Sequence, residues 1–588
     1  MESITSSFLS TFSPPSSVVP PPPRSSLPPP LPFRVLSIRI EEKPQTTTIS
    51  KRSSKKPEER PTPLLNNEKH IKKPAVLTNI FNAFDDIINK FIDQPLRDVV
   101  DPRHVLSGNF YPVDELPPTE CEVSEGTLPS CLDGVYLRNG PNPHFLPRGP
   151  YHLFDGDGML HAIRISKGKA TLCSRYVKTY KYNIEEDAGS PIVPNMFSGF
   201  NSLTASVARM TVTIARILAG QFNPFKGFGL ANTSLALFGN KLLALGESDL
   251  PYAIKLTPEG DIITLGRHDF DGKLFMSMTA HPKLDPVTKE VFAFRYSLLP
   301  PYLTFFWFDE KGEKQPNIPI FSKRSATFLH DFAITKNYAI FLEIQLGMSL
   351  TDMFHGGSPV SVNLGKVPRL GVIPRYAKDE SEMKWFEVLD WNSLHIINAW
   401  EEEDGDKVVM VAPNLLSVEH MLERMDLVHA SMEKVTINLK TGMVSRQPLS
   451  TRNLELAVIN PAFLTFKNRY IYCGVGDPLP KASGIVKLDV SLSEVDRQDC
   501  IIASRMFGPG CFGSEPFFVA REPDNRDADE DDGYIVSYVH NENTGESSFW
   551  VMDAKSSTLE IVAILKLPQR VPYGFHGLFV KESDIKKL

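Results

Sequence analysis

The sequence predicts an all-β protein, a seven-bladed β-propeller with a helical and loop dome over one face. Between residues 234 and 554, short segments rich in β-branched and aromatic residues alternate with glycine-containing turns. Turns of this kind between such segments are hairpin signals. There is no regular alternation of strands and helices of the kind that builds a parallel sheet. Four-stranded blades repeated around an axis account for this pattern, and a pair of barrels or sandwiches is the alternative.

Five hairpins are predicted, each with a turn dipeptide between two apolar segments. The turns are Gly239–Asn240, Glu259–Gly260, Lys311–Gly312, Thr441–Gly442 and Thr544–Gly545. Residues 105–588 would supply seven blades of roughly 70 residues each. Three long segments, residues 187–229, 351–384 and 413–429, are expected to form the dome.

Composition indicates a globular chain and excludes several classes of protein. Among 588 residues, 41% are hydrophobic and 23% are charged, as in core-forming domains. The net charge of −7 provides no basic surface for nucleic acid. Six scattered cysteines without a C-x-x-C pair argue against a structural zinc site and a secreted disulfide scaffold. The 37 phenylalanines indicate either an aromatic core or a long apolar tunnel.

The residues before position 105 are expected to lie outside the propeller. Residues 1–40 are rich in Ser and Pro, carry three arginines and have Glu2 as their single acid. This composition predicts a plastid transit peptide, with a disordered proline-rich tail as the alternative. Residues 41–75 are basic and polar, which predicts a disordered linker.

Residues 76–104 are predicted to form an amphipathic helical arm. Ile80, Phe84, Ile87 and Phe91 recur on one helix face. The arm either packs on the body or lies in a lipid surface. The apolar stretch 207–222 is a second candidate for the same face, and a lipid-soluble substrate could then enter without crossing water.

Four histidines occur in similar contexts, next to short apolar segments. They are His281, His330, His395 and His576, separated by 49, 65 and 181 positions. Any one of them alone is more simply a structural histidine, and no helical motif such as H-E-x-x-H is present. In a propeller, however, the inner strands of different blades point at one axis, so histidines about one blade apart converge. Four neutral imidazoles suit borderline metals, Fe(II) among them, and on an octahedral ion they leave two positions open for dioxygen or water.

Three glutamates lie in apolar surroundings that would be unusual for a solvated acid. They are Glu247, Glu455 and Glu515. Each is either a surface residue or, if buried, a group that needs a partner. Because ligand histidines usually donate their second ring N–H to a carboxylate, a metal-bound imidazole is a suitable partner.

Several sequence blocks resemble those of the carotenoid cleavage dioxygenases, and within them the plant plastid type often called the fourth class. The blocks are LRNGPNP (Leu137–Pro143), HLFDGDGMLHA (His152–Ala162), FLHDFAIT (Phe328–Thr335), NAWEEEDG (Asn398–Gly405), GSEPFFV (Gly513–Val519), EDDGY (Glu530–Tyr534) and VPYGFHG (Val571–Gly577). The resemblance covers about Val105 to Leu588. It implies a seven-bladed propeller and one Fe(II) per chain, held by His281, His330, His395 and His576.

The resemblance also implies the surroundings of the metal and the activity. Glu247, Glu455 and Glu515 would accept hydrogen bonds from three of the histidines, and the polyene tunnel would be lined by Phe154, Leu394, Leu456 and Phe575. The enzyme would use dioxygen to cleave a conjugated C=C bond of a carotenoid or apocarotenoid. At the 9,10 (or 9′,10′) bond this gives two carbonyl products such as β-ionone and an apocarotenal.

The expected partners are a lipophilic substrate and a membrane or plastoglobule surface in the plastid, with no nucleic acid. Two other functions are compatible with the sequence. One is iron acting as a Lewis acid in isomerisation or ester hydrolysis of a retinoid-like lipid. The other is a non-enzymatic binding propeller in which the four histidines are coincidental.

Overall fold

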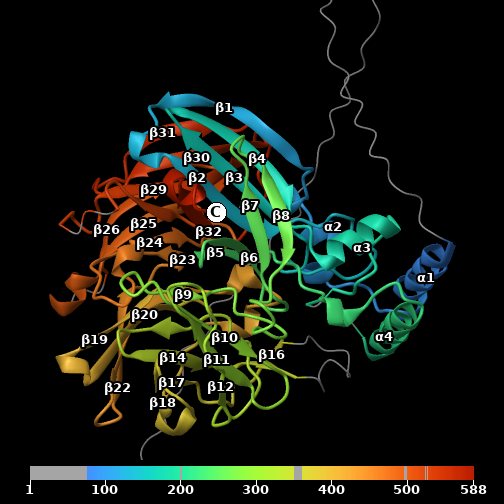
Figure 1. The fold of residues 1–588 in the computed structure, drawn as a ribbon, viewed down its shortest axis with the longest axis horizontal. Coiled ribbons are helices and arrows are strands. Elements are labelled where there is room, and N and C mark those ends of the chain that lie inside the picture. The colour runs from blue at the N-terminus through green and yellow to red at the C-terminus, as the bar shows by residue number, and fades with distance from the viewer. Residues whose placement is uncertain are drawn as a thin grey trace, which may run out of the picture. The chain divides into compact units, whose positions relative to one another are not determined.

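The computed structural model describes residues 76–588 except 196, 199–201, 350–359, 496–498, 524 and 526. The segments predicted as a transit peptide (1–40) and a linker (41–75) lie outside the described residues. Antiparallel strands are the main regular secondary structure of the described chain, and its longer helices gather on one side (Figure 1). None of these helices is both long and apolar enough to cross a membrane.

Five sheets have four strands each, and neighbouring strands within each sheet are antiparallel. The first contains β5 (Ser234–Phe238), β6 (Lys241–Leu245), β7 (Tyr252–Leu256) and β8 (Ile262–Arg267). The second contains β9 (Lys283–Leu284), β10 (Val291–Tyr296), β11 (Leu303–Phe308) and β12 (Ile318–Ile320). The third contains β13 (Ala333–Ile334), β14 (Tyr338–Glu343), β17 (Arg369–Pro374) and β18 (Lys384–Glu387), and the pair β15 (Leu346–Met348) and β16 (Val360–Val362) lies between β14 and β17 in the chain.

The fourth and fifth sheets follow the same plan. The fourth contains β19 (Asn398–Glu402), β20 (Lys407–Leu415), β21 (Ala430–Asn438) and β22 (Val444–Ser450). The fifth contains β23 (Leu454–Val458), β24 (Tyr470–Val475), β25 (Gly484–Asp489) and β26 (Ile501–Met506). Single-turn 3-10 helices connect many of these strands, for example Val418–His420 and Met425–Leu427 between β20 and β21.

The remaining ten strands form one sheet, so the prediction of seven separate blades is wrong. These strands are β1 (Leu116–Gly126), β2 (Gly134–Pro141), β3 (Gly158–Ser166), β4 (Lys169–Tyr176), β27 (Cys511–Gly513), β28 (Phe517–Ala520), β29 (Gly533–Asn541), β30 (Glu546–Asp553), β31 (Ile561–Lys566) and β32 (Gly577–Lys581). The physical reason is the length of β1, which pairs with β4 along Leu116–Cys121 and with β31 along Glu122–Gly126. One strand thus joins segments from both ends of the chain, and the structure has five four-stranded blades beside this larger sheet.

Apolar side chains fill the spaces between neighbouring sheets. One cluster joins β2–β4 to the first four-stranded sheet, and the next joins the first sheet to the second. Further clusters connect the second, third and fourth sheets, then the fourth to the fifth. The fifth sheet packs on β29 and β30 of the large sheet, which completes a closed, propeller-like ring.

All five predicted hairpins are confirmed. Four turns connect β5 to β6, β7 to β8, β21 to β22, and β29 to β30. The turn at Lys311–Gly312 is closed by a bridge between Phe308 and Lys314, and the chain then returns along β11 as β12. Glycine and asparagine supply the positive φ angles that these tight turns need, as at Gly239 and Asn240.

The three predicted dome segments differ in outcome. Residues 187–229 contain α4 (Leu203–Leu218), and residues 413–429 contain two 3-10 turns after the end of β20. The prediction for residues 351–384 is wrong in part, because Arg369–Pro374 forms β17, a central strand of the third sheet. Residues 351–359 lie outside the described residues.

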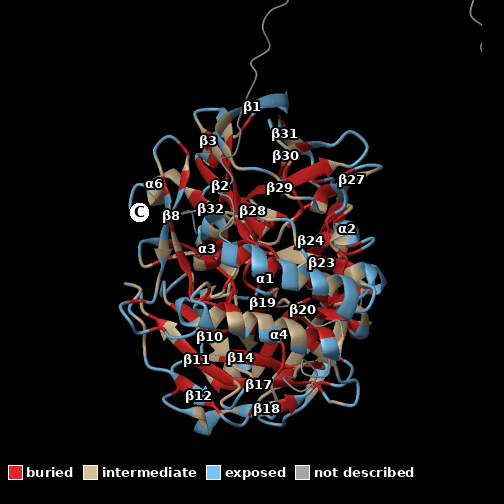
Figure 2. Cartoon of the chain, turned by 90° about the vertical axis from the view of Figure 1, so that its right-hand side faces the viewer, coloured by how far each residue is buried: buried red, intermediate tan, exposed pale blue. Residues whose placement is uncertain are grey.

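The α-helices of the described residues are α1 (Val76–Ile87), α2 (Pro102–Val105), α3 (Tyr180–Ala188), α4 and α6 (Glu582–Ile585), and α1 continues as a π-helical turn through Ile88–Ile92. Helices α1 and α4 lie side by side across one face of the molecule (Figure 2). Most of their large apolar side chains are exposed, including Phe91 (72%) and Leu218 (83%). The buried positions are mainly polar, such as Asn82 and Arg216, so these two helices turn their polar faces inward.

Candidate metal centre

Four histidines reach one point from four sheets. Each lies a few residues before a strand that ends its sheet: His281 before β9, His330 before β13, His395 before β19 and His576 before β32. Those terminal strands begin near the middle of the ring, because the histidines that precede them meet at one point. The local sequence therefore forms the strand after each histidine, and the arrangement of the sheets brings the four histidines together.

The four side chains are close enough to share one ion. One ring nitrogen from each histidine lies within 4.8 Å of the others. The Nε2 atoms of His281 and His330 are 2.9 Å apart. Two imidazole nitrogens bound at right angles about 2.1 Å from one ion would be about 3.0 Å apart.

A polar atom without a partner also points to a metal at this position. His395 Nε2 is buried and forms no hydrogen bond with any of the residues that the structure describes. Buried polar atoms in native proteins nearly always have a partner. A neutral imidazole nitrogen carries a lone pair, so the donor set of four imidazoles fits a divalent transition metal.

Three glutamates hold the opposite edges of the histidine rings. Glu455 lies 2.9 Å from His395 Nδ1, Glu515 lies 2.8 Å from His576 Nδ1, and Glu247 contacts His330 Nδ1. An ionised carboxylate can only accept a hydrogen bond, so Nδ1 of each ring carries the proton and Nε2 presents its lone pair inward. The structure thus brings all three glutamates against three of the four histidines, and it pairs Glu247 with His330, Glu455 with His395 and Glu515 with His576.

An irregularity in β23 directs Glu455 toward His395. The register between β23 and β24 shifts after Glu455, and Leu456 has a positive φ of 53°. A positive φ is uncommon for a residue with a branched side chain. The backbone N–H of Leu456 donates to the Glu455 carboxylate at 2.6 Å. Such bulges redirect side chains near functional sites, and here the bulge places one residue against a histidine and the next in the cavity.

The pKa values reflect this packing. Burial lowers the pKa of His281, and the neighbouring His576, His330 and His395 lower it further, well below its usual value. Burial also acts to lower the pKa of His395, but the Glu455 carboxylate outweighs burial and raises that pKa to about 9. The same contact lowers the pKa of Glu455 in spite of its burial. Crowding therefore disfavours a proton on His281, whereas the Glu455 carboxylate favours a second proton on His395, which a bound metal would displace.

A largely apolar cavity opens onto the histidines. It contains about 1520 Å³ of empty space, counting its open mouth. His330, His395, Glu247 and Glu455 are part of its lining. The four residues expected to line a tunnel, Phe154, Leu394, Leu456 and Phe575, all lie in this lining, together with Phe197, Phe328, Met348 and Met421.

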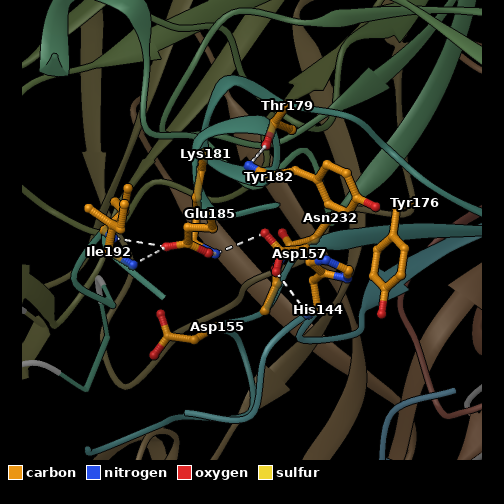
Figure 3. Close-up of polar contacts among 12 residues, drawn as sticks. His144, Asp155, Asp157, Tyr176, Thr179, Lys181, Tyr182, Glu185, Ile192 and Asn232 are labelled. Atoms are coloured by element: carbon orange, nitrogen blue, oxygen red, sulfur yellow. Dashed lines mark hydrogen bonds and ion pairs between the residues drawn. The ribbon is translucent and has the colours of Figure 1, made fainter. Parts of the chain in front are cut away.

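A buried ion network fixes the loop that carries Phe154. Lys181 on α3 donates to Asp157 at 2.9 Å and to Glu185 at 2.7 Å, and Figure 3 shows it between the two carboxylates. Glu185 in turn accepts from the backbone N–H of Ile192 at 2.9 Å. Asn232 donates to the carbonyl of Phe154 at 3.1 Å, so that loop is held from two sides.

The chain matches one protein family over most of its length. A profile of the Retinal pigment epithelial membrane protein family matches residues 110–581. The chain is 62% identical to the probable carotenoid cleavage dioxygenase 4 (chloroplastic) of Arabidopsis thaliana, over 95% of this chain and 96% of the relative. It is 59% identical to a chloroplastic 9-cis-epoxycarotenoid dioxygenase of Oryza sativa subsp. japonica, over 86% of this chain and 80% of the relative. The chain belongs to the carotenoid cleavage dioxygenase family.

Solved structures of related enzymes agree with this family assignment. A mutant of Synechocystis apocarotenoid oxygenase has a TM-score of 0.67 and 26% identity, covering 83% of this chain and 100% of that chain. The family match begins at residue 110 and therefore includes all four histidines and all three glutamates. Helix α1 lies before the matched residues.

One side chain at the site of this carotenoid cleavage dioxygenase, Tyr296, is not predicted from the sequence. Tyr296, at the end of β10, donates its hydroxyl to Glu247 at 2.7 Å. Burial and the Glu247 carboxylate raise the pKa of Tyr296 well above its usual value, so the hydroxyl stays protonated and remains a donor. Tyrosines near strand ends are common, and no spacing in the sequence relates this one to Glu247.

Proposed function

We propose that this carotenoid cleavage dioxygenase is a non-haem Fe(II) enzyme that cleaves a carotenoid or apocarotenoid at the 9,10 (or 9′,10′) double bond. The products are two carbonyl compounds, such as β-ionone and an apocarotenal. One observation carries the proposal: four imidazoles converge at a point that borders a large apolar cavity. A polyene is the class of substrate that needs both.

His281, His330, His395 and His576 would hold the iron, one ion per chain. When bound, ferrous iron supplies the activation of dioxygen, the co-substrate of the reaction. Glu247, Glu455 and Glu515 keep three of the imidazoles in the tautomer that presents Nε2 to the metal. The glutamates also supply negative charge close to a centre whose direct ligands are all neutral.

The cavity residues position the substrate. Phe154 and Phe575 contact each other edge to face, with ring centroids 5.8 Å apart. With Leu394 and Leu456 they form an apolar wall beside the histidines. A rigid conjugated chain between such walls has few orientations, and placing one double bond at the reactive centre is the main contribution that a protein can make. The same walls exclude water from the reacting bond.

The proposed bond position is supported by relatives. A Crocus sativus protein with the printed name carotenoid 9,10(9′,10′)-cleavage dioxygenase is 40% identical over 87% of this chain. Other relatives are named for a 7,8(7′,8′) bond or for 9-cis-epoxycarotenoids. The family therefore acts at several bonds, and product analysis decides among them.

The deciding experiment is incubation of purified enzyme with β-carotene and with an apocarotenal under ¹⁸O-labelled dioxygen. Mass spectrometry should find β-ionone and the complementary aldehyde, with label in the carbonyl oxygens. Fragments of other lengths would overturn the bond position. Isomerised or hydrolysed product without label would favour Lewis-acid chemistry, and protein purified without oxygen that carries no stoichiometric iron would favour a binding scaffold.

Two substitutions separate the roles of histidine and glutamate. His330→Ala should remove iron and activity together, because only three of the four imidazole ligands remain and the fourth position is left empty. Glu455→Gln keeps the shape of the side chain and should lower iron affinity about 10- to 100-fold, with a partial loss of activity. Full iron content in the His330 variant, measured by metal analysis, would contradict the assignment.

We further propose that residues 1–40 are a plastid transit peptide, that 41–75 are a linker, and that the protein works at a membrane or plastoglobule surface. The outward apolar faces of α1 and α4 support this location. Their inward polar faces form ion pairs, such as Arg216 with Asp85 at 2.6 Å, so the helices are fixed without using their apolar sides. An amphipathic helix that lies in a lipid surface presents its apolar face in this way.

A further inference from the structure

A buried ion pair lies directly behind the four histidines. Lys283 Nζ is 2.8 Å from one carboxylate oxygen of Asp331 and 3.0 Å from the other. The Asp331 side chain is 3% exposed and the Lys283 side chain 13%. Lys283 follows His281 by two residues, and Asp331 follows His330 directly. The pair therefore connects the second and third sheets at the positions where they present their histidines.

The same pair also holds the backbone next to the third histidine. The Asp331 carboxylate accepts the backbone N–H of Ile396 at 2.8 Å, and Lys283 Nζ donates to the Ile396 carbonyl at 3.3 Å. Ile396 follows His395 directly. Both polar groups of this residue are thus bound by one ion pair, which joins three histidine-bearing segments from three sheets.

Two of those segments lead into very short strands that do little to hold their register. Strands β9 and β13 are two residues long, and each forms two residue pairs with its neighbour. His281, His330 and His395 all lie outside the strands, in loops that belong to different sheets. Small independent shifts of these loops would change the distances among the imidazoles, unless a contact between the loops prevents it.

We propose that Lys283 and Asp331 are positioning residues that set the spacing of His281, His330 and His395 for the metal. This inference rests on the proposed metal site. His576 is held separately, because the backbone N–H of Asn139 donates to its carbonyl at 3.0 Å and the N–H of Phe575 donates to Asn139 at 2.9 Å. Loss of the ion pair should therefore loosen three ligands and leave the fourth in place.

A second buried ion pair provides a matched control. Lys487 Nζ lies 2.6 Å from Asp531 and 3.0 Å from the Ala554 carbonyl. Like the first pair, it joins a lysine, an aspartate and a backbone carbonyl, with side chains 3% and 9% exposed. Neither residue is adjacent in sequence to a histidine of the cluster. Breaking either pair leaves a buried charge without its partner and destabilises the fold, but only the first pair should affect the metal.

The test compares Co(II) binding to metal-free wild type, Asp331→Asn and Asp531→Asn. Co(II) is chosen because its visible absorption bands report coordination geometry and its affinity for nitrogen ligands is near that of Fe(II). Asp331→Asn should weaken Co(II) binding about 10- to 100-fold, the usual effect of losing an outer partner of a metal site, and should alter the spectrum. Asp531→Asn should lower the melting temperature by a similar amount while keeping the wild-type affinity and spectrum.

Each outcome has a distinct meaning. If Asp331→Asn binds Co(II) with wild-type affinity and spectrum, the positioning role is wrong. If both variants weaken the metal equally, the effect is one of general stability, and the inference fails as well. Should Asp331→Asn not fold, Lys283→Met is measured against Lys487→Met by the same criteria. Failure of the wild type itself to bind Co(II) would instead overturn the proposed metal site.

Discussion

Each glutamate behind the histidines has a second contact that fixes its carboxylate. Glu515 contacts His576 with one oxygen and accepts the backbone N–H of Gly577 at 3.1 Å with the other. Glu247 accepts the Tyr296 hydroxyl with the oxygen that does not face His330, whereas Glu455 accepts the N–H of Leu456 with the same oxygen that contacts His395. A second contact restrains rotation of each carboxylate away from its histidine. Two contacts on each carboxylate leave the imidazole rings little freedom to turn.

Replacement of Tyr296 by Phe tests this argument at a single atom. The change leaves one oxygen of Glu247 without its donor, which should cost about 1–3 kcal/mol of unfolding free energy. Iron affinity should fall by less than in a Glu247→Gln variant, because the contact between Glu247 and His330 remains. Denaturant unfolding and iron titration measure the two effects. Tyr302→Phe is the control, since the Tyr302 hydroxyl bonds to none of the described residues, and equal losses in both variants would contradict the role of Tyr296.

Lys323 makes stability depend on pH above neutrality. Its ammonium is buried beside Ser325 and Thr327, and burial lowers its pKa to about 7 although Glu343 acts in the opposite direction. In the unfolded chain the pKa is near 10.4, so between about pH 7 and pH 10 the unfolded chain binds the extra proton. The unfolding free energy from this group therefore rises with pH, by up to about 1.4 kcal/mol per unit.

Substitution of Lys323 by Met should remove that rise. Melting temperatures between pH 7.5 and pH 9.5 (roughly the middle of the window set by the two pKa values) should increase more steeply for wild type than for the variant. The matched variant Lys336→Met, at an exposed position, should keep the wild-type slope. Parallel curves for wild type and Lys323→Met would show that the buried ammonium does not titrate in this range.

At the scale of elements, the outward apolar faces of α1 and α4 allow the proposed lipid-surface location to be tested. Transfer of one exposed side chain such as Phe91 or Leu218 into lipid is worth about 1.5–3 kcal/mol. Replacing either residue by Glu should thus weaken vesicle binding about 10-fold or more. Liposome flotation measures this, with Leu389→Glu as a control at another exposed leucine, 66% exposed and distant in sequence from both helices. Unchanged flotation of both helix variants would exclude these helices as the docking face.

The elements also show which features a sequence can predict. Turn dipeptides such as Thr544–Gly545 specify a hairpin through a few neighbouring residues, so all five were predictable. The merging of strands through β1 was not, because it depends on pairing with β31, which is more than 400 residues away in sequence. The sequence predicts a loop for residues 369–374, but these residues pair with β14 and β18 on either side and form a central strand. Their apolar run is short and contains Gly371, which weakens the strand signal.

The candidate site was predictable to a different degree. The histidines and the glutamates can be recognised because each stands in an apolar sequence context, and the resemblance to a family makes their selection specific. Tyr296 and the Lys283–Asp331 pair were not recognised, since their importance comes from contacts between sheets and not from local sequence. Groups that act across the ring become visible only when the ring is assembled.

At the scale of the whole molecule, one strand would link closure of the ring to metal binding at the proposed site. His576 directly precedes β32, which pairs with β2 near the other end of the described chain. The other three histidines come from three other sheets, so an ion bound to all four joins distant parts of the ring. An ion that binds the closed form and not the opened form stabilises closure, by about 2.7 kcal/mol at a hundredfold excess over its dissociation constant.

Hydrogen exchange can detect this linkage. Adding Fe(II) without oxygen to the metal-free protein should slow exchange of the β32 amides, because opening of this strand must displace His576. Strand β26, the outer strand of a sheet that contributes no histidine to the cluster, should exchange at the same rate with and without metal. In His576→Ala the protection of β32 should disappear even if the remaining histidines retain some iron. Metal saturation that leaves β32 exchange unchanged would mean that the ring closes independently of the ion.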